Sequence, residues 1–174
     1  MLKVVKINPV IKEKIEVDQY IPIKIRWSEF DSNNKKIIYW RTGDIKKSML
    51  EFGISAISGE IRSLTIVFAD KISFALKDFS GCNTFERGTP VFDVSSWIGK
   101  RTVDDRGLFE VHYCNEKLYM IISENSISKE LISGRVSFGL DAGMNICRIS
   151  VNGLSNDEKF QIKDTLEYIE RTSL

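Results

Sequence analysis

Apolar and polar residues alternate along most of the chain. Between residues 21 and 27, isoleucines and Trp27 fall on every second position, and Lys24 and Arg26 lie between them. An alternation of period two places successive side chains on opposite faces of a strand, and it is typical of half-buried antiparallel strands. Pro22 cannot donate a backbone hydrogen bond, so it favours an edge strand or the first residues of a strand. We therefore expect a protein built mainly from β-strands.

Three pairs of alternating segments are each joined by a short polar connection, as the strands of β-hairpins are. The first connection carries Gly59, which we interpret as a turn residue with positive φ. The pattern therefore predicts three antiparallel hairpins. Their strands and connections are 49–54 and 63–68 through 55–60, 109–113 and 118–122 through 114–117, and 136–140 and 147–151 through 141–145.

The period of the pattern changes after residue 151. Ser155 and Glu158 have the spacing of a capping box at the start of a helix. Ile162 and Leu166 then recur at helical spacing, which predicts a helix over residues 156–171. We expect this helix to cover the apolar face of the sheet. The predicted fold class is α+β, with a mainly antiparallel β-sheet built from hairpins and a C-terminal helix packed on it.

The middle of the chain is rich in turn-forming residues. We predict loops over residues 77–90 and 100–107. The chain is long enough to bury a substantial core and to form a single domain over residues 1–174. Within that domain, one interpretation has two similar β-rich halves, about 1–80 and 90–174.

An internal similarity motivates that division into halves. The segment 52–56, FGISA, aligns without gaps with the segment 138–142, FGLDA, and the alignment then places Arg62 on Arg148. A duplicated half would explain the similarity. Two hairpins that solve the same turn problem independently would also explain it, and the slip in apolar phase after the connection favours this second interpretation.

The composition is that of an ordinary globular protein. The chain is 43% hydrophobic and 28% charged, and its formal net charge is +1. A net charge so close to zero gives no global field that would attract nucleic acid or an anionic membrane. No segment approaches the roughly 20 apolar residues that a membrane-spanning helix needs. We therefore predict a cytoplasmic protein without a membrane partner, whose three cysteines are reduced core residues.

Familiar motifs of catalytic and nucleotide-binding loops are missing from the sequence. The single histidine, His112, shares a predicted strand face with Glu110, and one hypothesis is a small hydrolase that uses His112 for acid-base chemistry. A general base also needs a nucleophile and a pocket, and the sequence indicates neither. One histidine and scattered cysteines do not make a zinc site. We predict that the protein is not an enzyme, with no catalytic, cofactor-binding or metal-binding residues and no cofactor.

The second predicted loop carries the charged run Asp104-Asp105-Arg106. Metal binding or acid catalysis there would need further ligands or a second acid, which the sequence does not supply. Adjacent aspartates in loops are commonly exposed turn formers. A protruding charged loop suits a protein interface, so we predict that these residues contact a protein partner.

Basic and aromatic residues are interleaved between residues 26 and 41. Such residues can stack on bases and neutralise phosphates when a single strand of nucleic acid lies on a sheet. Trp27 also belongs to the apolar face of its predicted strand, and the near-neutral net charge argues against strong phosphate binding. A sheet-based single-stranded nucleic-acid-binding module is therefore the alternative function. The residues concerned are Arg26, Trp27, Lys35, Lys36, Tyr39, Trp40 and Arg41.

The segment 50–68, LEFGISAISGEIRSLTIVF, resembles a hairpin of bacterial immunity proteins. These are small cytosolic partners that neutralise the C-terminal toxins of contact-dependent growth inhibition and polymorphic toxin systems. Gly53, Ser58, Gly59 and the segment 61–66 carry the resemblance. It implies an antitoxin that binds one cognate toxin protein directly and tightly. The toxin is commonly a nuclease, and its active site is often occluded.

Inhibitors of nucleases are often strongly acidic, whereas this chain is close to neutral. The acidic contribution would then be local, around one end of the second predicted hairpin, or the toxin would have another activity. A rigid scaffold with complementary surface charge is what an inhibitor needs. The predicted partner-binding residues are Asp104, Asp105, Arg106, Glu110 and Glu116.

Overall fold

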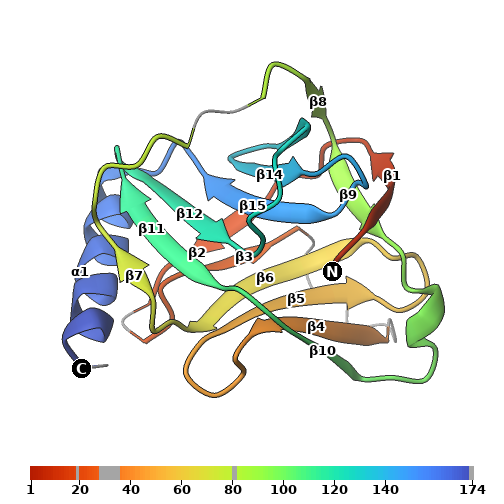
Figure 1. Ribbon diagram of the computed structural model, residues 1–174, viewed down its shortest axis with the longest axis horizontal. Coiled ribbons are helices and arrows are strands. Elements are labelled where there is room, and N and C mark those ends of the chain that lie inside the picture. The colour runs from red at the N-terminus through yellow and green to blue at the C-terminus, as the bar shows by residue number, and fades with distance from the viewer. Residues whose placement is uncertain (19, 28–35, 80–81, 173–174) are drawn as a thin grey trace.

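The computed structural model describes residues 1–18, 20–27, 36–79 and 82–172. Figure 1 shows the strands packed together in the body of the molecule, with the helix α1 along one side. The elements are β1 (Val4–Asn8), β2 (Lys14–Glu16), β3 (Lys24–Arg26), β4 (Ile37–Gly43), β5 (Met49–Ser55), β6 (Ile61–Phe68), β7 (Ile72–Ser73), β8 (Phe85–Arg87), β9 (Thr89–Phe92), the short 3-10 helix η1 (Ser95–Trp97), β10 (Thr102–Arg106), β11 (Glu110–Cys114), β12 (Lys117–Ile121), β13 (Lys129–Ser133), β14 (Val136–Leu140), β15 (Ile146–Val151) and α1 (Asn156–Thr172).

The first sheet has six strands in the order β10-β4-β5-β6-β3-β2. Neighbouring strands are antiparallel, except that the edge strand β10 runs parallel to β4. β5 and β6 form the first predicted hairpin, and Pro22 lies just before β3, as expected for the start of a strand. The alternating apolar residues face the core, and Ile25, Trp40, Phe52 and Leu64 are examples.

The second sheet has seven strands in the order β7-β11-β12-β15-β14-β13-β8. Its central strands are antiparallel, and β7 and β8 add parallel edges. The second and third predicted hairpins are β11–β12 and β14–β15. The predicted α+β class is confirmed, although both sheets are mixed and not purely antiparallel.

The two sheets repeat one order of strands. β4-β5-β6-β3-β2 follow one another in the first sheet, and β13-β14-β15-β12-β11 follow one another in the second. When the five strands of each group are numbered by their order along the chain, their order across the sheet is third, fourth, fifth, second, first in both sheets. The parallel edge strands also correspond, because β10 lies beside β4 and β8 lies beside β13. The chain therefore contains two five-stranded units of one topology. Duplication of a single unit stays a prediction, which this order supports.

The apolar faces of the two sheets cover each other in one core. Trp27, which follows β3, contacts Phe138 of β14, with ring centroids 5.9 Å apart. The Trp27 indole N–H donates a hydrogen bond of 3.2 Å to the hydroxyl of Ser133 on β13. Buried side chains of both sheets belong to a single cluster. Removing apolar surface from water, at roughly 25 cal/mol per Å², is the main term that stabilises such a core.

A two-stranded ribbon of β1 and β9 joins the tips of two hairpins. Lys3, beside β1, forms a bridge with Asn145 at the tip of β14–β15, and the Ile146 N–H donates to the Leu2 carbonyl at 3.0 Å. The tip of β5–β6 is bridged in the same way to β9. β1, which precedes the first five-stranded unit, is therefore attached to the hairpin of the second unit, and β9, which lies between the two units in the chain, is attached to the hairpin of the first.

The helix α1 begins at the predicted capping box. The Glu158 N–H donates to the Ser155 hydroxyl at 3.2 Å, and the Ser155 N–H donates to the Glu158 carboxylate at 2.8 Å. These reciprocal bonds satisfy backbone donors that a helix start leaves unpaired. Ile162 and Leu166 are buried, as the helical spacing predicts.

The position of α1 differs from the expected lid over a sheet. Lys159 Nζ contacts the Glu116 carboxylate, in the β11–β12 turn, at 2.7 Å. The Thr165 hydroxyl donates to the Asp18 carbonyl, between β2 and β3, at 3.2 Å. The helix therefore lies along the side where the β2–β3 end of one sheet and the β11–β12 end of the other meet. The second sheet, not the helix, covers the apolar face of the first.

Both predicted loops in the middle of the chain contain strands, so those predictions are wrong. β10 occupies most of the predicted loop 100–107, and β8 and the start of β9 lie within 77–90. β10 does not look like a strand because Asp104, Asp105 and Arg106 make up most of it. An edge strand pairs on one side only and often carries charges that discourage further pairing. Its partner β4 also lies far upstream, where local patterns give no hint of it.

The two segments that align in sequence occupy equivalent places in the two units. Gly53 of β5 and Gly139 of β14 are each followed by a bulge in the pairing with the next strand. Gly53 pairs with Ser63, whereas Gly139 pairs with Arg148. Arg148 is therefore equivalent to Ser63. The gapless alignment, by contrast, places Arg148 on Arg62.

A difference in turn length explains the one-residue slip. The Ser55 N–H donates to the Glu60 carbonyl, whereas the Asp141 N–H donates to the Asn145 carbonyl, so the first connection is one residue longer. Gly59 supplies the extra turn residue with φ of 71°. A Cβ atom there would clash with the Phe92 carbonyl oxygen, so the prediction of a turn glycine is confirmed.

The three cysteines are all free thiols. Cys114 and Cys147 are buried, as predicted, and burial raises the pKa of Cys147. Cys82 is only half-buried, and its thiol donates to the Thr84 carbonyl. Among the described residues, no helix is long and apolar enough to cross a membrane.

Candidate protein-binding face

The outer side of the six-stranded sheet carries the polar half of each alternating strand. Because successive side chains of a strand point to opposite faces, the residues between the core positions all project to this side. We call this surface the polar face. Its members are Lys14, Glu16, Lys24, Arg26, Tyr39, Arg41, Glu51, Ser63, Thr65, Thr102, Asp104 and Arg106.

The strand register places charged residues in one row across the whole sheet. Neighbouring strands lie about 4.8 Å apart, so a row across six strands is roughly 24 Å long. Five of the six positions are charged, with both signs interspersed. In order from β10 to β2, the row is Asp104, Arg41, Glu51, Thr65, Lys24 and Glu16.

Ion pairs fix the charges at both ends of this row. At the β10 edge, Arg41 Nε lies 2.8 Å from Asp104 Oδ1. At the β2 edge, Glu16 lies 3.0 Å from the Arg26 guanidinium and 3.1 Å from Lys14 Nζ. The hydrogen bond from Lys14 and the charge of Arg26 lower the pKa of Glu16, although partial desolvation acts against them. Glu16 therefore stays ionised at neutral pH.

The middle of the row is different. Within the described part of the chain, neither Glu51 nor Lys24 has an ion pair or a side-chain hydrogen bond. Both side chains are half-buried. Burial raises the pKa of Glu51, and the positive charges of Arg41 and Lys24 offset only part of that rise.

The structure distributes the predicted partner-binding residues over two sheets. Asp104 and Arg106 lie on the polar face at the β10 edge. Asp105 points the opposite way and contacts the amino group of Met1. The charged run is therefore split by strand alternation, and only two of its three residues share the polar face.

Glu110 and Glu116 lie on the second sheet, at opposite ends of β11. Glu110 is 3.7 Å from Lys71 Nζ, whereas Glu116, in the β11–β12 turn, binds Lys159 of α1. A strand of this length spans roughly 13 Å. The predicted acidic residues are therefore not brought together at one end of the hairpin.

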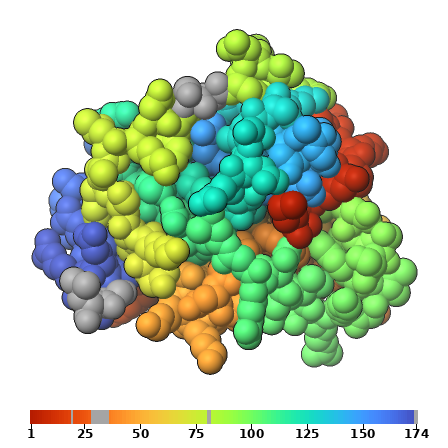
Figure 2. All heavy atoms as spheres, viewed as in Figure 1, coloured from red at the N-terminus to blue at the C-terminus, as the bar shows by residue number. Residues whose placement is uncertain are grey.

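An aromatic cluster covers part of the outer side of the second sheet. Phe79, after β7, stacks on Tyr119 of β12 with ring centroids 4.3 Å apart. It also makes an edge-type contact with the His112 ring, with centroids 5.1 Å apart. The Arg148 guanidinium lies 5.9 Å from the Phe79 centroid and donates to the Phe79 carbonyl at 3.2 Å. In Figure 2, the segment after β7 (yellow-green) lies on the surface beside the green and teal strands β11 and β12.

His112 is only 8% exposed beneath this cluster. Its Nε2 lies 3.4 Å from the Glu110 carboxylate, and its Nδ1 is buried without a hydrogen-bond partner in the described residues. A carboxylate can therefore orient the ring, as the acid-base hypothesis expects. Within the same residues, no serine or threonine hydroxyl and no cysteine thiol is hydrogen-bonded to His112. The geometry supplies an orienting acid but no positioned nucleophile.

The basic and aromatic segment proposed for nucleic acid is divided between core and surface. Trp27 is 0% exposed and Trp40 is 2% exposed, so neither indole can stack on a base. Tyr39 is half-buried on the polar face, and Lys36 is exposed just before β4. Lys35 lies outside the described residues.

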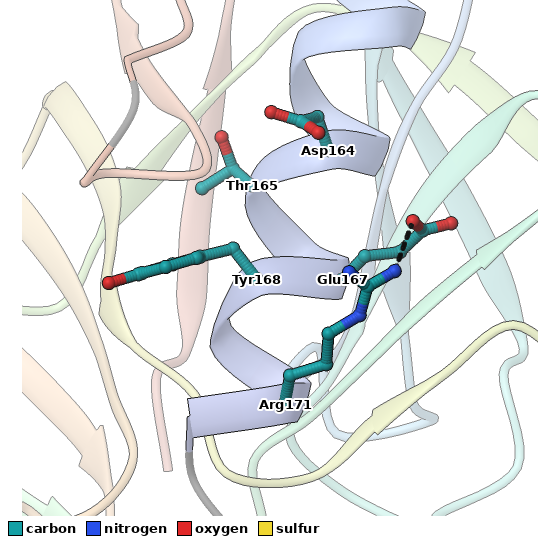
Figure 3. Close-up of a pocket in the computed structure, with 5 residues that line it drawn as sticks. All are labelled: Asp164, Thr165, Glu167, Tyr168 and Arg171. Atoms are coloured by element: carbon teal, nitrogen blue, oxygen red, sulfur yellow. Dashed lines mark hydrogen bonds and ion pairs between the residues drawn. The ribbon is translucent and has the colours of Figure 1, made fainter.

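The described residues also line shallow hollows. One, of about 140 Å³, lies on α1 and is lined by polar residues (Figure 3). Figure 3 shows Thr165 and Tyr168 pointing to one side of the helix, with Glu167 and Arg171 on the other. The second hollow, of about 90 Å³, lies beside Trp40 and β10. Within the described residues, no group of three histidine, cysteine or acidic side chains is placed to hold a metal ion.

Sequence reasoning identifies residues of the polar face but not their alignment. Alternation places Lys24 on the polar side of a predicted strand, Glu51 lies in the segment that resembles immunity-protein hairpins, and Arg41 is noted only among the basic and aromatic residues of the nucleic-acid alternative. Their alignment in one row depends on the pairing of strands distant in the chain. No protein-family model matches the chain, and no curated protein matches it.

Proposed function

We propose that this protein is a bacterial immunity protein that acts in the cytoplasm without catalysis, binding a cognate toxin domain and inhibiting it by direct contact. The observation that carries the proposal is the row of alternating charges on the polar face, held on a rigid sheet and fixed by ion pairs at both ends. The resemblance of the segment 50–68 to immunity-protein hairpins supplies the class of partner.

The pattern of charge suits a protein partner. Charges of both signs at fixed positions can match a complementary pattern on one partner and repel others. Ion pairs between β4 and β10 and between β2 and β3 hold four of these side chains in place. A surface that is already ordered loses less conformational entropy on binding.

The nucleic-acid alternative receives less support. Its two tryptophans are core residues, and Arg26 and Arg41 are each paired with a carboxylate on the polar face. Phosphate binding would have to compete with those carboxylates, because counterion release needs cations that are available to the backbone. Stacking would rely on Tyr39, since neither tryptophan can reach a base.

Co-expression tests the proposal. The toxin domain encoded beside the gene is expressed with or without this chain, and growth and complex formation are measured. We expect protection and a stable complex, and Asp104→Lys should weaken both because it reverses a charge at the edge of the polar face. Glu124→Lys is the matched control, since Glu124 is exposed between β12 and β13 on the other sheet.

The absence of both binding and protection with wild-type protein would contradict the proposed function. A parallel titration with a single-stranded oligonucleotide across salt concentrations tests the alternative. Affinity that falls steeply with salt would support nucleic-acid binding, and no measurable affinity would remove it.

A further inference from the structure

Two opposite charges at the centre of the polar face have no partner in the described part of the chain. Glu51 of β5 and Lys24 of β3 lie in the same row as the paired charges at its ends. Arg41, the cross-strand neighbour of Glu51, already binds Asp104 at 2.8 Å. Glu16, the cross-strand neighbour of Lys24, is already held by two cations.

The register fixes the distance between these two charges. Thr65 of β6 pairs with Glu51 on one side and with Lys24 on the other. Two strand spacings separate the charged residues, which is about 10 Å between their backbones. Thr65 is uncharged and buried, so it neutralises neither charge.

Both side chains are half-buried, so each has lost part of its hydration without gaining an ion pair or a side-chain hydrogen bond in the described residues. A charged group that loses contact with water without gaining an ion pair or hydrogen bond is destabilised. Burial raises the pKa of Glu51, which reflects that cost in this carboxylate. A partner that supplied the opposite charges would form favourable ion pairs with Glu51 and Lys24. Because folding has already removed part of the water around these two side chains, less desolvation would remain on binding.

We infer that Glu51 and Lys24 form the central contact of the polar face with the toxin, and that the toxin presents a lysine or arginine to Glu51 and a carboxylate to Lys24, about 10 Å apart. This inference rests on the proposed function and specifies the chemistry of the partner. The paired charges at the ends of the row hold the sheet surface in shape around this contact.

The test is a binding titration of the purified toxin domain encoded beside the gene. Wild type, Glu51→Gln and Lys24→Gln are compared, and each substitution removes one charge with little change in shape. We expect each dissociation constant to rise about tenfold. The double variant Glu51→Lys with Lys24→Glu keeps the net charge and should lose at least as much affinity, because it reverses the order of the two charges.

Two controls separate this contact from general effects. Lys117→Gln, in β12, and Glu124→Gln, in the loop between β12 and β13, remove exposed charges away from the polar face and should leave the affinity unchanged. Thermal unfolding of every variant shows whether it is folded, and the neutral variants keep the inference testable if the double variant does not fold.

The outcomes distinguish the contact from the function. If wild type does not bind the toxin domain, the proposed function fails and this contact fails with it. If wild type binds and the Gln variants bind equally well, the contact alone is overturned. If the double variant keeps wild-type affinity, only net charge matters and the ordered pair is likewise overturned.

Discussion

The outer faces of the two sheets occupy equivalent positions on the same five-stranded topology, and their chemistry differs. The register makes Lys24 equivalent to Tyr119. By the same pairing, Ser63 is equivalent to Arg148. On the first sheet these positions belong to a row of charged and polar residues. On the second, Tyr119 and Arg148 pack under Phe79, which comes from the chain itself.

The inner faces show less divergence. Phe52 and Phe138 are equivalent, and both are buried in the common core. The core positions must fill one interior at high density, which limits what they can become. The outward positions carry no such constraint. The outer face of the second sheet can therefore be covered by the segment around Phe79, while the outer face of the first sheet keeps an ordered set of charges. This difference is why we assign partner binding to the first sheet.

The largest effect is expected where the two units share a core. Phe52→Ala and Phe138→Ala each remove a fully buried ring and should each lower the free energy of unfolding by about 3–5 kcal/mol. Urea denaturation followed by tryptophan fluorescence and by circular dichroism measures this loss. The two signals should coincide in a single transition, because one cluster spans both sheets. Two separate transitions would show that the units unfold independently.

A second comparison concerns the turns of the equivalent hairpins. The Asp141 carboxylate accepts 2.9 Å hydrogen bonds from the Gly143 and Asn145 N–H groups and another from the Asn125 amide. The equivalent Ser55 hydroxyl accepts one such bond, from the Ser58 N–H at 3.2 Å. Asp141→Asn should cost about 2 kcal/mol and Ser55→Ala about 1 kcal/mol, measured by urea denaturation at pH 7.

The pH dependence of the Asp141 effect has a definite sign. Burial alone would raise the pKa of Asp141, but the hydrogen bonds from Asn145, Asn125 and Gly143 outweigh it and lower the pKa. Its contribution is therefore present above the pKa of the unfolded chain, about 3.9, and is lost as the pH falls through the lower folded value. The Asp141→Asn difference should shrink in acid, whereas the Ser55→Ala difference should not. Equal behaviour of both variants in acid would contradict this assignment.

The covering segment of the second sheet gives a smaller effect. Phe79→Ala should destabilise the protein by about 1–2 kcal/mol, because a partly buried ring loses its contacts with Tyr119 and His112. Limited proteolysis should then cut more readily in residues 74–79, since one of their side-chain anchors is gone and, within the described residues, only the Phe74 contact with Tyr113 is left among their ring contacts. Leu76→Ala is the control in the same segment. Leu76 is 81% exposed, and its loss should stay within about 0.5 kcal/mol.

The smallest effect is expected at Glu51, on the polar face that we propose binds the toxin. Burial raises the folded-state pKa of this carboxyl, so the stability of wild type should decline as the pH rises from the unfolded value of about 4.3 through the folded one. Glu51→Gln removes this penalty and should stabilise the unbound protein at pH 7 by no more than about 0.5 kcal/mol. Thermal unfolding at pH 4 and pH 7 checks the sign. A Gln variant less stable than wild type at pH 7 would show that Glu51 makes a stabilising contact in the free protein.

Local patterns predict the parts of the fold that depend on local chemistry. The hairpin β11–β12 and the start of α1 at Ser155 follow from alternation, a polar turn and a capping box. β10 could not be predicted, because its charged sequence becomes a strand only by pairing with β4. The row through Glu51 needs the register of six strands between residues 14 and 106, and no window of sequence contains it. The site is therefore harder to predict than the elements that form it.

The ribbon of β1 and β9 has a consequence for the order in which the protein can form. Of the described strands, β1 is synthesised before all the others, yet it pairs with β9, and its neighbour Lys3 bridges to Asn145 at the tip of β14–β15. Synthesis proceeds at about 5–20 residues per second, so β1 waits for several seconds before its partners exist. Pairing between such distant segments is also intrinsically slow. We expect the pairing of β1 with β9 to be a late step of folding. That step would attach the tips of the β5–β6 and β14–β15 hairpins at the same time.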